Sequence, residues 1–496
     1  ARKEFWSMNP YAPRAYGSLQ RVTDRVYIFR NIVNSAVILG DAAVAVIDTQ
    51  VNTTLALRLL QQVRSLSNKP IRYAINTHYH WDHTGGNSVF KNVGATVVSS
   101  ARTREFIQER TPRQKAFLLS RAFDLGPDPY LADETVSISR TLDLGNQPLY
   151  LQHLGRAETD DAMAIHLPQE GCVAAGDTVM TGSFPIFGQP VMNEGLMGTS
   201  DWLATIANLE RLHPEHILPG HGPVAYAAEL DLLKRLQRFF LEEVGVRVAR
   251  QMPLAELLND LESQLPEWIT SLPVTWGTPR YAILRVYRGL VDDPSGEAGW
   301  QHYKPSAIPA GDTGKVTTAC VGLTELRALQ QVANEFAEGG DIGSAIAVAR
   351  RATILAAAVP DAWVLLAELL IRGSRQVASV LEKGDFFQEA QQALQRALEL
   401  DPQHAPTHVA LGGFIVMRAY RNGDDPTAGM AHVRQVIDRL AMPPQGPDRA
   451  LLAQAHFYLG MGYRTQGQER QALACFNTAL ACLPSFAPAR LAQQRA

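Results

Sequence analysis

Short apolar runs alternate with amphipathic stretches through about the first 230 residues, and this pattern predicts a mixed α/β domain. We expect strands at 26–29, 35–39, 44–48 and 71–76, and a helix over 53–66, where leucines recur at helical spacing. Further strands are predicted at 95–99, 149–154, 162–167, 172–175 and 216–218, and a helix at 202–212. Several of these strands end on polar residues, so chemistry is expected at the strand ends.

The strand pattern stops after about residue 228, and the rest of the chain is predicted to be helical. A stretch rich in proline, glycine and aspartate over 292–314 is typical of a linker. Near the C-terminus, Gly460, Tyr463, Ala472, Ala479 and Pro484 fall at the offsets of the tetratricopeptide repeat, although a plain array of helical hairpins is the alternative. We therefore expect a catalytic domain over 1–228, a helical segment and linker over 229–314, and a tetratricopeptide-like domain over 315–496 that forms a homodimer.

Composition narrows the partners of this protein. The 496 residues carry a net charge of −3, which offers no basic face for nucleic acid or an anionic membrane, and no apolar run is long enough to span a bilayer. The four cysteines are scattered and predict neither a disulfide framework nor a metal site. The chain starts at Ala1 without a methionine, so we expect a periplasmic or secreted protein if a signal peptide was removed, and otherwise a cytoplasmic one.

The densest candidate chemistry is the stretch THYHWDHTGGN, residues 77–87, which holds three of the thirteen histidines. His78 and His80 are two apart, so on extended backbone their side chains leave the same side. Asp82 and His83 follow in a loop that we expect to fold toward a second point. Such mixed nitrogen and oxygen donors suit Zn²⁺, and the stretch predicts a metal site rather than a hydrogen-bonded polar loop. The two glycines are expected to let the backbone turn tightly, and Asn87 to cap the next helix.

Two ions need more than four ligands, and two later stretches supply candidates. Asp177, in AAGDTV, follows an apolar strand and is placed to bridge two metals, although a strand-end turn would also explain it. His221, in LPGHGP, lies in a tight loop bounded by proline and glycine, which favours an aimed imidazole.

These three stretches, in this order and each at a strand end, resemble the metallo-β-lactamase superfamily. The resemblance covers about residues 20–225 and implies a four-layer αβ/βα sandwich with its metals along one sheet edge. It implies one metal at His78, His80 and a third ligand, and a second metal at Asp82, His83 and His221, with Asp177 between them.

The third ligand departs from the family pattern. Where family members show a histidine after glycine, this sequence has Glu158 in GRAETDD. We expect Glu158 to bind the metal, because Zn²⁺ accepts a glutamate oxygen. His153 is the rival ligand, and loss of the first metal is the other interpretation.

The alkylsulfatase branch of the superfamily also has a Glu at this point, followed nineteen positions on by a second acid, as Asp177 follows Glu158 here. The stretch over 275–296 is similar to the segment that precedes the helical dimerisation region of that branch. Its C-terminal sterol-carrier-like domain is not expected here, which weakens the case for its long-chain substrate pocket.

The function predicted from these residues is a dinuclear zinc hydrolase of sulfate or phosphate esters with an apolar substituent, in which a metal-bridging hydroxide is the nucleophile. Asp177 would hold the two ions in register, and Asp82 would orient the nucleophile or move its proton. Arg156 could reach a sulfate or phosphate oxygen, although pairing with a nearby aspartate explains it equally well. The predicted apolar contacts to the substrate are Trp81, Phe184 and Phe187, the last two from a loop rich in glycine and proline, for which shielding or a dimer contact is the alternative role.

Two other functions remain open at this point. One is a lactam, lactone or thioester hydrolase, because the same fold supports all three reactions. The other is a helical-repeat scaffold in which the metal domain has become structural.

Overall fold

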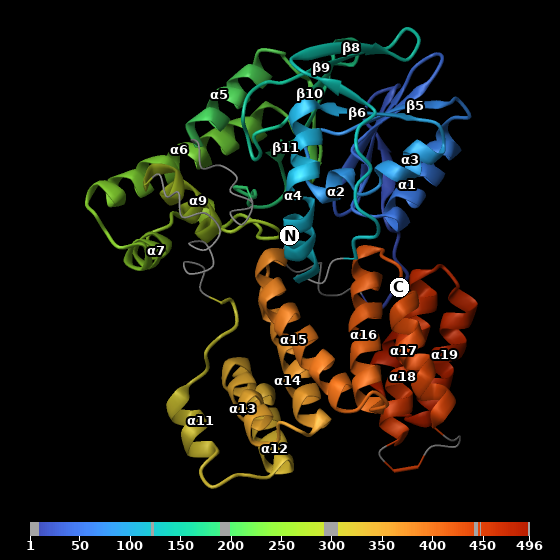
Figure 1. Ribbon diagram of the computed structural model, residues 1–496, viewed down its shortest axis with the longest axis vertical. Coiled ribbons are helices and arrows are strands. Elements are labelled where there is room, and N and C mark those ends of the chain that lie inside the picture. Colours follow the sequence, from blue (N-terminus) through green and yellow to red (C-terminus); the bar gives the residue numbers. More distant parts are fainter. Residues whose placement is uncertain are drawn as a thin grey trace.

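The computed structural model describes residues 9–120, 124–188, 199–291, 306–440, 445–446 and 448–494. In the N-terminal part, two β-sheets face each other and helices cover both outer faces, which gives a four-layer αβ/βα sandwich (Figure 1). A largely helical region lies below the sandwich in this view. The sandwich predicted from the sequence is therefore confirmed.

The first sheet has seven strands in chain order, antiparallel from β1 to β4 and parallel from β4 to β7. Its strands are β1 (Ser18–Arg21), β2 (Val26–Arg30), β3 (Asn34–Leu39), β4 (Val44–Ile47), β5 (Ile71–Ile75), β6 (Thr96–Ser100) and β7 (Glu134–Val136). The change to parallel pairing sends the ends of β4 and β5 to one edge, where the polar residues that follow them meet.

The second sheet has the order β12-β11-β10-β9-β8, in which only β11 and β12 are parallel. Its strands are β8 (Ser139–Asp143), β9 (Pro148–Gln152), β10 (Ala164–Leu167), β11 (Cys172–Met180) and β12 (His216–His221). Both β11 and β12 continue beyond their predicted ends, so that Asp177 lies inside a strand and His221 is the last residue of one, rather than in loops.

Branched apolar side chains from both sheets, such as Ile47, Ile75, Leu151 and Ile165, are buried between them. The outer face of the first sheet is covered by α1 (Thr53–Leu66) and α3 (Asn87–Asn92). The second sheet is covered by α5 (Thr199–Glu210), α6 (Ala227–Ala249) and α9 (Pro279–Val291), with α7 (Leu254–Ser263) and α8 (Glu267–Thr270) beside them. The two remaining helices of the sandwich are α2 (Trp81–Thr84) and α4 (Ala101–Ser120).

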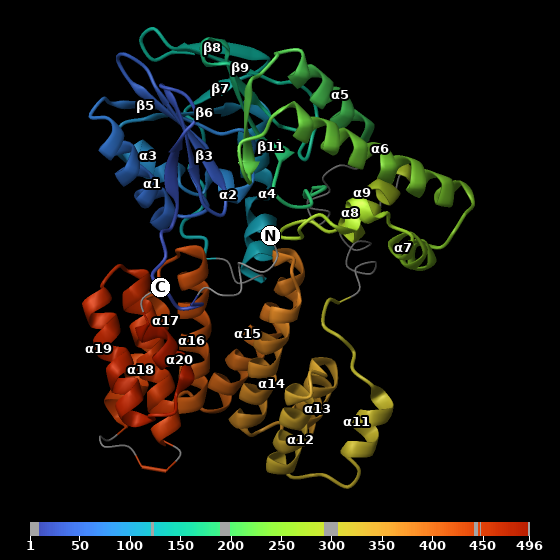
Figure 2. The same ribbon diagram turned by 180° about the vertical axis from the view of Figure 1, so that it is seen from behind.

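The C-terminal region consists of antiparallel helical hairpins, which Figure 2 shows from behind. Its helices are α11 (Thr313–Ala319), α12 (Leu326–Glu338), α13 (Ile342–Leu355), α14 (Pro360–Gly373), α15 (Val380–Leu400), α16 (Ala405–Asn422), α17 (Thr427–Arg439), α18 (Asp448–Thr465), α19 (Glu469–Cys482) and α20 (Ala487–Gln493). A Cβ on Gly460 of α18 would lie 2.6 Å from the Phe476 ring of α19, so these two helices pack closely. The helical character of this region is confirmed, whereas its assignment as tetratricopeptide repeats stays a prediction.

Polar contacts join the helical region to the sandwich. The Asn52 side chain caps α1 by accepting from the Leu55 backbone N–H at 3.0 Å, and its amide donates to Asp424 at 3.0 Å. The Tyr16 hydroxyl donates to the Tyr420 carbonyl oxygen at 2.8 Å. The N-terminal end of α1 is therefore held to the segment that follows α16, and Tyr16 is held to the last turn of α16.

The strands missed by the sequence pattern are β1, β7 and β8, which are short. In β1 and β8 most side chains are exposed, so these strands carry no apolar run. Most of the predicted linker, 292–305, lies outside the described residues. Among the described helices, none is long and apolar enough to cross a membrane, and the four cysteines are free thiols.

Candidate metal centre

Seven potential ligand side chains from both sheets meet at one edge of the sandwich. His78 and His80 follow β5, and α2 carries Asp82 and His83. The others are Glu158 in the loop between β9 and β10, Asp177 in β11 and His221 at the end of β12. These residues form two groups. Within each group the ligand atoms lie within 4.8 Å of one another, so each group could hold a metal ion.

The first group contains His78, His80, Glu158 and Asp177, all of them buried. The Nδ1 atom of His80 lies 3.5 Å from a Glu158 carboxylate oxygen, and the Nε2 atom of His78 lies 3.8 Å from Asp177 Oδ2. The glutamate that stands in place of the family's usual histidine thus points into this group.

The second group contains Asp82, His83 and His221. Asp82 Oδ2 lies 3.3 Å from the Nε2 atom of His221 and 3.6 Å from that of His83. Asp82 is the most accessible of the three, with its side chain 24% exposed, whereas His83 is fully buried. This group is therefore reached from solvent past Asp82.

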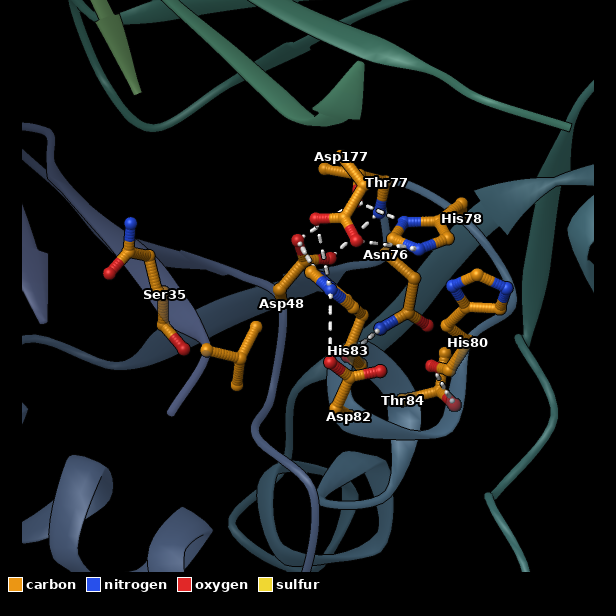
Figure 3. Close-up of polar contacts among 12 residues, drawn as sticks. Ser35, Asp48, Asn76, Thr77, His78, His80, Asp82, His83, Thr84 and Asp177 are labelled. Carbon is orange, nitrogen blue, oxygen red and sulfur yellow. Dashed lines mark hydrogen bonds and ion pairs between the residues drawn. The ribbon is translucent and has the colours of Figure 1, made fainter. Parts of the chain in front are cut away.

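Asp177 lies between the two groups. Its Oδ1 atom is 3.3 Å from His83 Nε2, and its Oδ2 atom is 3.5 Å from His221 Nε2 and 3.8 Å from His78 Nε2 (Figure 3 shows all of these except His221). One carboxylate that faces both groups has the placement that a bridging ligand requires.

A second layer of hydrogen bonds orients the histidines. The Nδ1 atom of His83 lies 2.8 Å from Asp48 Oδ2, and Asp48 also accepts from the backbone N–H and the hydroxyl of Thr77, both at 2.8 Å. His221 Nδ1 lies 2.8 Å from the Ile32 carbonyl oxygen. Because these partners accept a hydrogen bond from Nδ1–H, Nε2 is the nitrogen of His83 and His221 that faces the centre and would bind a metal.

Asp48 is the functional residue that the sequence analysis missed. It follows β4 with φ 59°, in the left-handed region that a non-glycine residue seldom adopts. The only signal in the sequence was a polar residue that ends an apolar strand, and this signal does not say which side chain the carboxylate will meet.

The glycines near the site are explained by close approach. A Cβ on Gly86 would lie 1.9 Å from the Thr49 carbonyl oxygen, and a Cβ on Gly220 would lie 1.8 Å from Asp177 Oδ1. The prediction that Gly86 permits a tight turn was therefore incomplete, since its φ of −93° suits any residue. The predicted cap at Asn87 was wrong, because Gly86 is the N-cap and the Asn87 side chain bonds instead to buried polar groups of Thr49 and Asn76.

The pKa values of the buried ligands are shifted by burial and by one another's charges. Burial lowers the pKa of His83, but the charges of Asp177, Asp82 and Asp48 outweigh burial and raise this pKa well above its ordinary value. The same competition, with Asp177 as the main charge, raises the pKa of His221 to about 10. Burial raises the pKa of Asp177, but His221 and His83 lower it well below its ordinary value. The buried carboxylates therefore stabilise positive charge on His83 and His221.

The ligand atoms of this site are suited to a divalent cation. Within the described residues, Nε2 of His78, Nε2 of His83 and Oδ1 of Asp177 are buried and make no hydrogen bond. Burial and the neighbouring His83 and His80 lower the pKa of His78 well below its ordinary value, so this ring is neutral and free to coordinate. Imidazole nitrogens and carboxylate oxygens are the ligands that Zn²⁺ prefers, and bound cations would replace the protons on His83 and His221.

The predicted substrate contacts lie elsewhere than expected. Phe184 and Phe187 are 0% and 1% exposed and pack in the core against Phe240, so the argument that they line a surface loop was wrong. Trp81 is also buried, and its indole N–H donates to the Leu125 carbonyl oxygen at 3.3 Å. These aromatic residues belong to the hydrophobic core. Residues 189–198, the remainder of the predicted apolar loop, lie outside the described residues.

Two other candidates are placed clearly. Arg156 is half-exposed and pairs with Asp201 at 3.7 Å, not with the aspartates that follow it in sequence. The rival ligand His153 lies outside both groups, and its Nδ1 atom is 2.7 Å from the Ala162 carbonyl oxygen.

Comparison with known proteins agrees with this geometry. A sequence model of the Metallo-beta-lactamase superfamily matches residues 28–221. The chain is 25% identical over 207 residues to a metallo-beta-lactamase type 2 of Bacillus cereus, covering 40% of this chain and 73% of the relative. It is 22% identical over 327 residues to a linear primary-alkylsulfatase of a Pseudomonas species, covering 56% of this chain and 58% of the relative.

A solved structure resembles more of the molecule. The stereoselective inverting sec-alkylsulfatase Pisa1 from Pseudomonas sp. matches with a TM-score of 0.54 and 17% identity, covering 76% of this chain and 65% of that chain. At this identity the likeness concerns the fold. It nevertheless extends beyond the sandwich into the helical region, since the sandwich with its covering helices ends at Val291 and makes up less than 60% of the sequence, whereas the match covers 76%.

Proposed function

We propose that this chain, whose residues 28–221 belong to the metallo-beta-lactamase superfamily, is a dinuclear zinc hydrolase of sulfate esters or phosphate esters with an apolar substituent. The observation that carries the proposal is the convergence of seven ligand side chains in two groups with Asp177 between them. A structural metal site would not need an accessible side of the kind that Asp82 provides.

His78, His80 and Glu158 would hold one zinc ion, and Asp82, His83 and His221 would hold the other. When bound, such a pair supplies a nucleophile from water near neutral pH and polarises the ester. The work of the chain is to keep this geometry fixed. Asp177 holds the two groups in register, and Asp48 keeps the His83 ring in one orientation through its Nδ1 atom.

Asp82 is the residue best placed to orient a nucleophilic water. Burial raises its pKa, but the charge of His83 and a hydrogen bond with His221 lower it below its ordinary value, so the carboxylate is ionised at neutral pH. Its partial exposure lets it meet both the incoming water and the solvent. An ionised, reachable carboxylate can accept a hydrogen bond from a nucleophilic water and so orient it.

Two considerations support sulfate or phosphate esters. The proposed ligands contain three carboxylates, which leave one net positive charge on two divalent cations, so an anionic or polar ester is attracted. The alkylsulfatase relatives are also similar to more of this chain than the lactamase is. Arg156, loosely paired at 3.7 Å and half-exposed, is the proposed contact to the anionic group.

For the helical region, we propose tetratricopeptide-like packing and a homodimer. The repeat packing is supported by the succession of hairpins, α12 with α13, α14 with α15, α16 with α17, and α18 with α19. The homodimer is proposed from the similarity of residues 275–296 to the segment that precedes the helical dimerisation region of the alkylsulfatases. Light scattering of the full chain tests the dimer, and a monomeric mass would contradict it.

The deciding experiment combines metal analysis with a substrate panel. The purified chain is assayed on chromogenic sulfate, phosphodiester, phosphotriester, lactone and cephalosporin substrates before and after removal of metal by a chelator. We expect about two zinc ions per chain and turnover of a sulfate or phosphate ester that is lost on chelation and restored by zinc. Turnover of the lactone or cephalosporin alone would favour the other class of hydrolase. A full complement of zinc without turnover of any substrate would favour a structural metal domain.

A further inference from the structure

One aromatic side chain from outside the sheets reaches the metal centre. The Trp276 ring lies 4.9 Å from the His221 ring, centroid to centroid, at an interplanar angle of 53°. Trp276 comes from the connection between α8 and α9, which follows the residues matched to the superfamily. Unlike Trp81, Phe184 and Phe187, it is partly exposed.

The position of Trp276 coincides with the accessible side of the site. Asp177 and Glu158 are at most 4% exposed, whereas the Asp82 side chain is 24% exposed. Asp82 Oδ2 is 3.3 Å from the Nε2 atom of His221, the ring against which Trp276 packs. A substrate that approaches past Asp82 therefore arrives beside the Trp276 indole.

We propose that Trp276 is a specificity-determining residue that contacts the apolar substituent of the substrate, and that Ser379 of the helical region is a positioning residue that holds it there. The proposal rests on the proposed hydrolase function. A large, partly exposed aromatic ring beside a polar centre offers apolar area at small entropic cost, because its side chain has only two rotatable bonds.

The backbone around Trp276 is held from two sides. From the helical region, the Ser379 hydroxyl donates to the Trp276 carbonyl oxygen at 2.7 Å, and the Val380 N–H donates to the Thr275 carbonyl oxygen at 2.8 Å. From the sandwich, the Phe184 N–H donates to the Pro273 carbonyl oxygen at 2.7 Å. The Ser379 side chain is fully buried, so its hydrogen bond is shielded from water.

Close backbone packing completes this arrangement. A Cβ on Gly277 would lie 2.0 Å from the Pro185 carbonyl oxygen, so the residue after Trp276 lies directly against the sandwich. Figure 2 shows the upper end of α15 just below the connection that leads to α9. The helical region thus contributes to the shape of the site through the first residues of α15, without supplying a ligand.

The test measures binding of two sulfonates to the zinc-loaded full chain by calorimetry. Sulfonates mimic the anionic group, and their carbon–sulfur bond is not an ester, so binding is read without turnover. We expect Trp276→Ala to weaken 1-decanesulfonate binding about tenfold, which equals about 1.4 kcal/mol of binding free energy, and to change methanesulfonate binding less than twofold. Trp276→Phe keeps an aromatic ring and should stay within about threefold of wild type.

Trp268 of α8 provides the matched control, because its ring packs against Phe239 of α6 and not against a proposed ligand. Trp268→Phe should bind both sulfonates as wild type does. Equal decanesulfonate binding by wild type and Trp276→Ala, or no decanesulfonate binding by wild type, would overturn the inference. A chain that binds decanesulfonate through Trp276 but hydrolyses no ester would instead overturn the proposed function.

The role of Ser379 is tested separately. Ser379→Ala removes one hydrogen bond and should weaken decanesulfonate binding about threefold to tenfold, while the zinc content stays unchanged. It should also shift the fluorescence emission of Trp276, which is obtained as the difference between variants with and without Trp276. Ser374→Ala is the control, because the Ser374 hydroxyl is also buried but donates to Ile371 within its own helical turn at 2.8 Å. If Ser379→Ala and Ser374→Ala have the same decanesulfonate affinity and emission, Ser379 is not a positioning residue.

Discussion

The two halves of the metal centre are built differently. In the half formed by Asp82, His83 and His221, the Nδ1 atoms of both histidines are hydrogen-bonded. That of His83 bonds to Asp48, and that of His221 bonds to the Ile32 carbonyl oxygen. In the half formed by His78, His80 and Glu158, the carboxylate comes from the loop between β9 and β10. Its backbone is held by Arg285 of α9, whose guanidinium donates to the Ala157 carbonyl oxygen at 2.9 Å and to that of Glu158 at 3.3 Å.

This difference concerns one ligand of each half: His221 ends a strand, whereas Glu158 lies in a loop whose backbone is held by a helix outside the sheets. Ligands on strand ends keep their positions as long as the sheets are paired. A ligand in a loop keeps its position only while the surrounding contacts persist, so changes around Glu158 should displace this ligand more readily than changes around His221 displace that one.

The strongest way to break the comparison is to remove the residue that both halves share. Asp177→Asn keeps the size of the side chain but removes its charge, and we expect both zinc ions to be lost and turnover to fall at least about 10³-fold, or about 4 kcal/mol in the activation barrier. Elemental analysis and ester turnover measure this. Retention of two ions with full activity would exclude a bridging role.

Substitution of Glu158 should separate the halves. Glu158→Ala is expected to lose one of two zinc ions and most of the turnover, whereas Glu158→His, which restores the family's usual ligand, should keep both ions. His153→Ala is the matched control and should keep both, because His153 lies outside the two groups. Two ions retained in Glu158→Ala would show that Glu158 is not a ligand.

A smaller effect on metal affinity is expected from a residue that orients a ligand without being one. Asp48→Asn leaves every proposed ligand in place but weakens the acceptor for His83 Nδ1. Loss of such a partner typically lowers metal affinity by about 10–100-fold, and we expect this loss only for the ion at Asp82, His83 and His221. Competition with a chromogenic chelator measures the two affinities. An equal loss at both ions would mean that the halves are not independent.

The smallest effect is a pH dependence of stability in the metal-free protein. The pKa of His221 is raised from 6.5 to about 10, so its protonated form stabilises the fold fully below pH 6.5, and this contribution is lost as the pH rises toward 10. Thermal unfolding of chelator-treated protein should therefore show Tm falling by a few degrees between pH 7 and pH 10. Zinc-loaded protein should lack this dependence, because the metal replaces the proton. A pH-independent Tm in the metal-free form would contradict the ion pairs of His221 with Asp82 and Asp177.

The sequence predicted much of the site because its residues are informative one by one. His78, His80, Asp82 and His83 are of ligand type and lie within six positions, so their proximity needed no tertiary information. Asp177 and His221 were recognisable because each follows an apolar strand run, and parallel neighbours bring such positions to one edge. Glu158 came from the resemblance to a family rather than from spacing.

What the sequence determined by itself was the alternation of strands and helices, the helical C-terminal region and the set of ligand-type side chains, because these depend on local periodicity and residue chemistry. Only the tertiary structure decided that Phe184 and Phe187 are buried, that Arg156 meets Asp201, that Asp48 supports His83 and that Trp276 packs on His221. Burial and pairing depend on which distant segment closes over a side chain. That choice is made by the packing of the whole chain, and no local pattern records it.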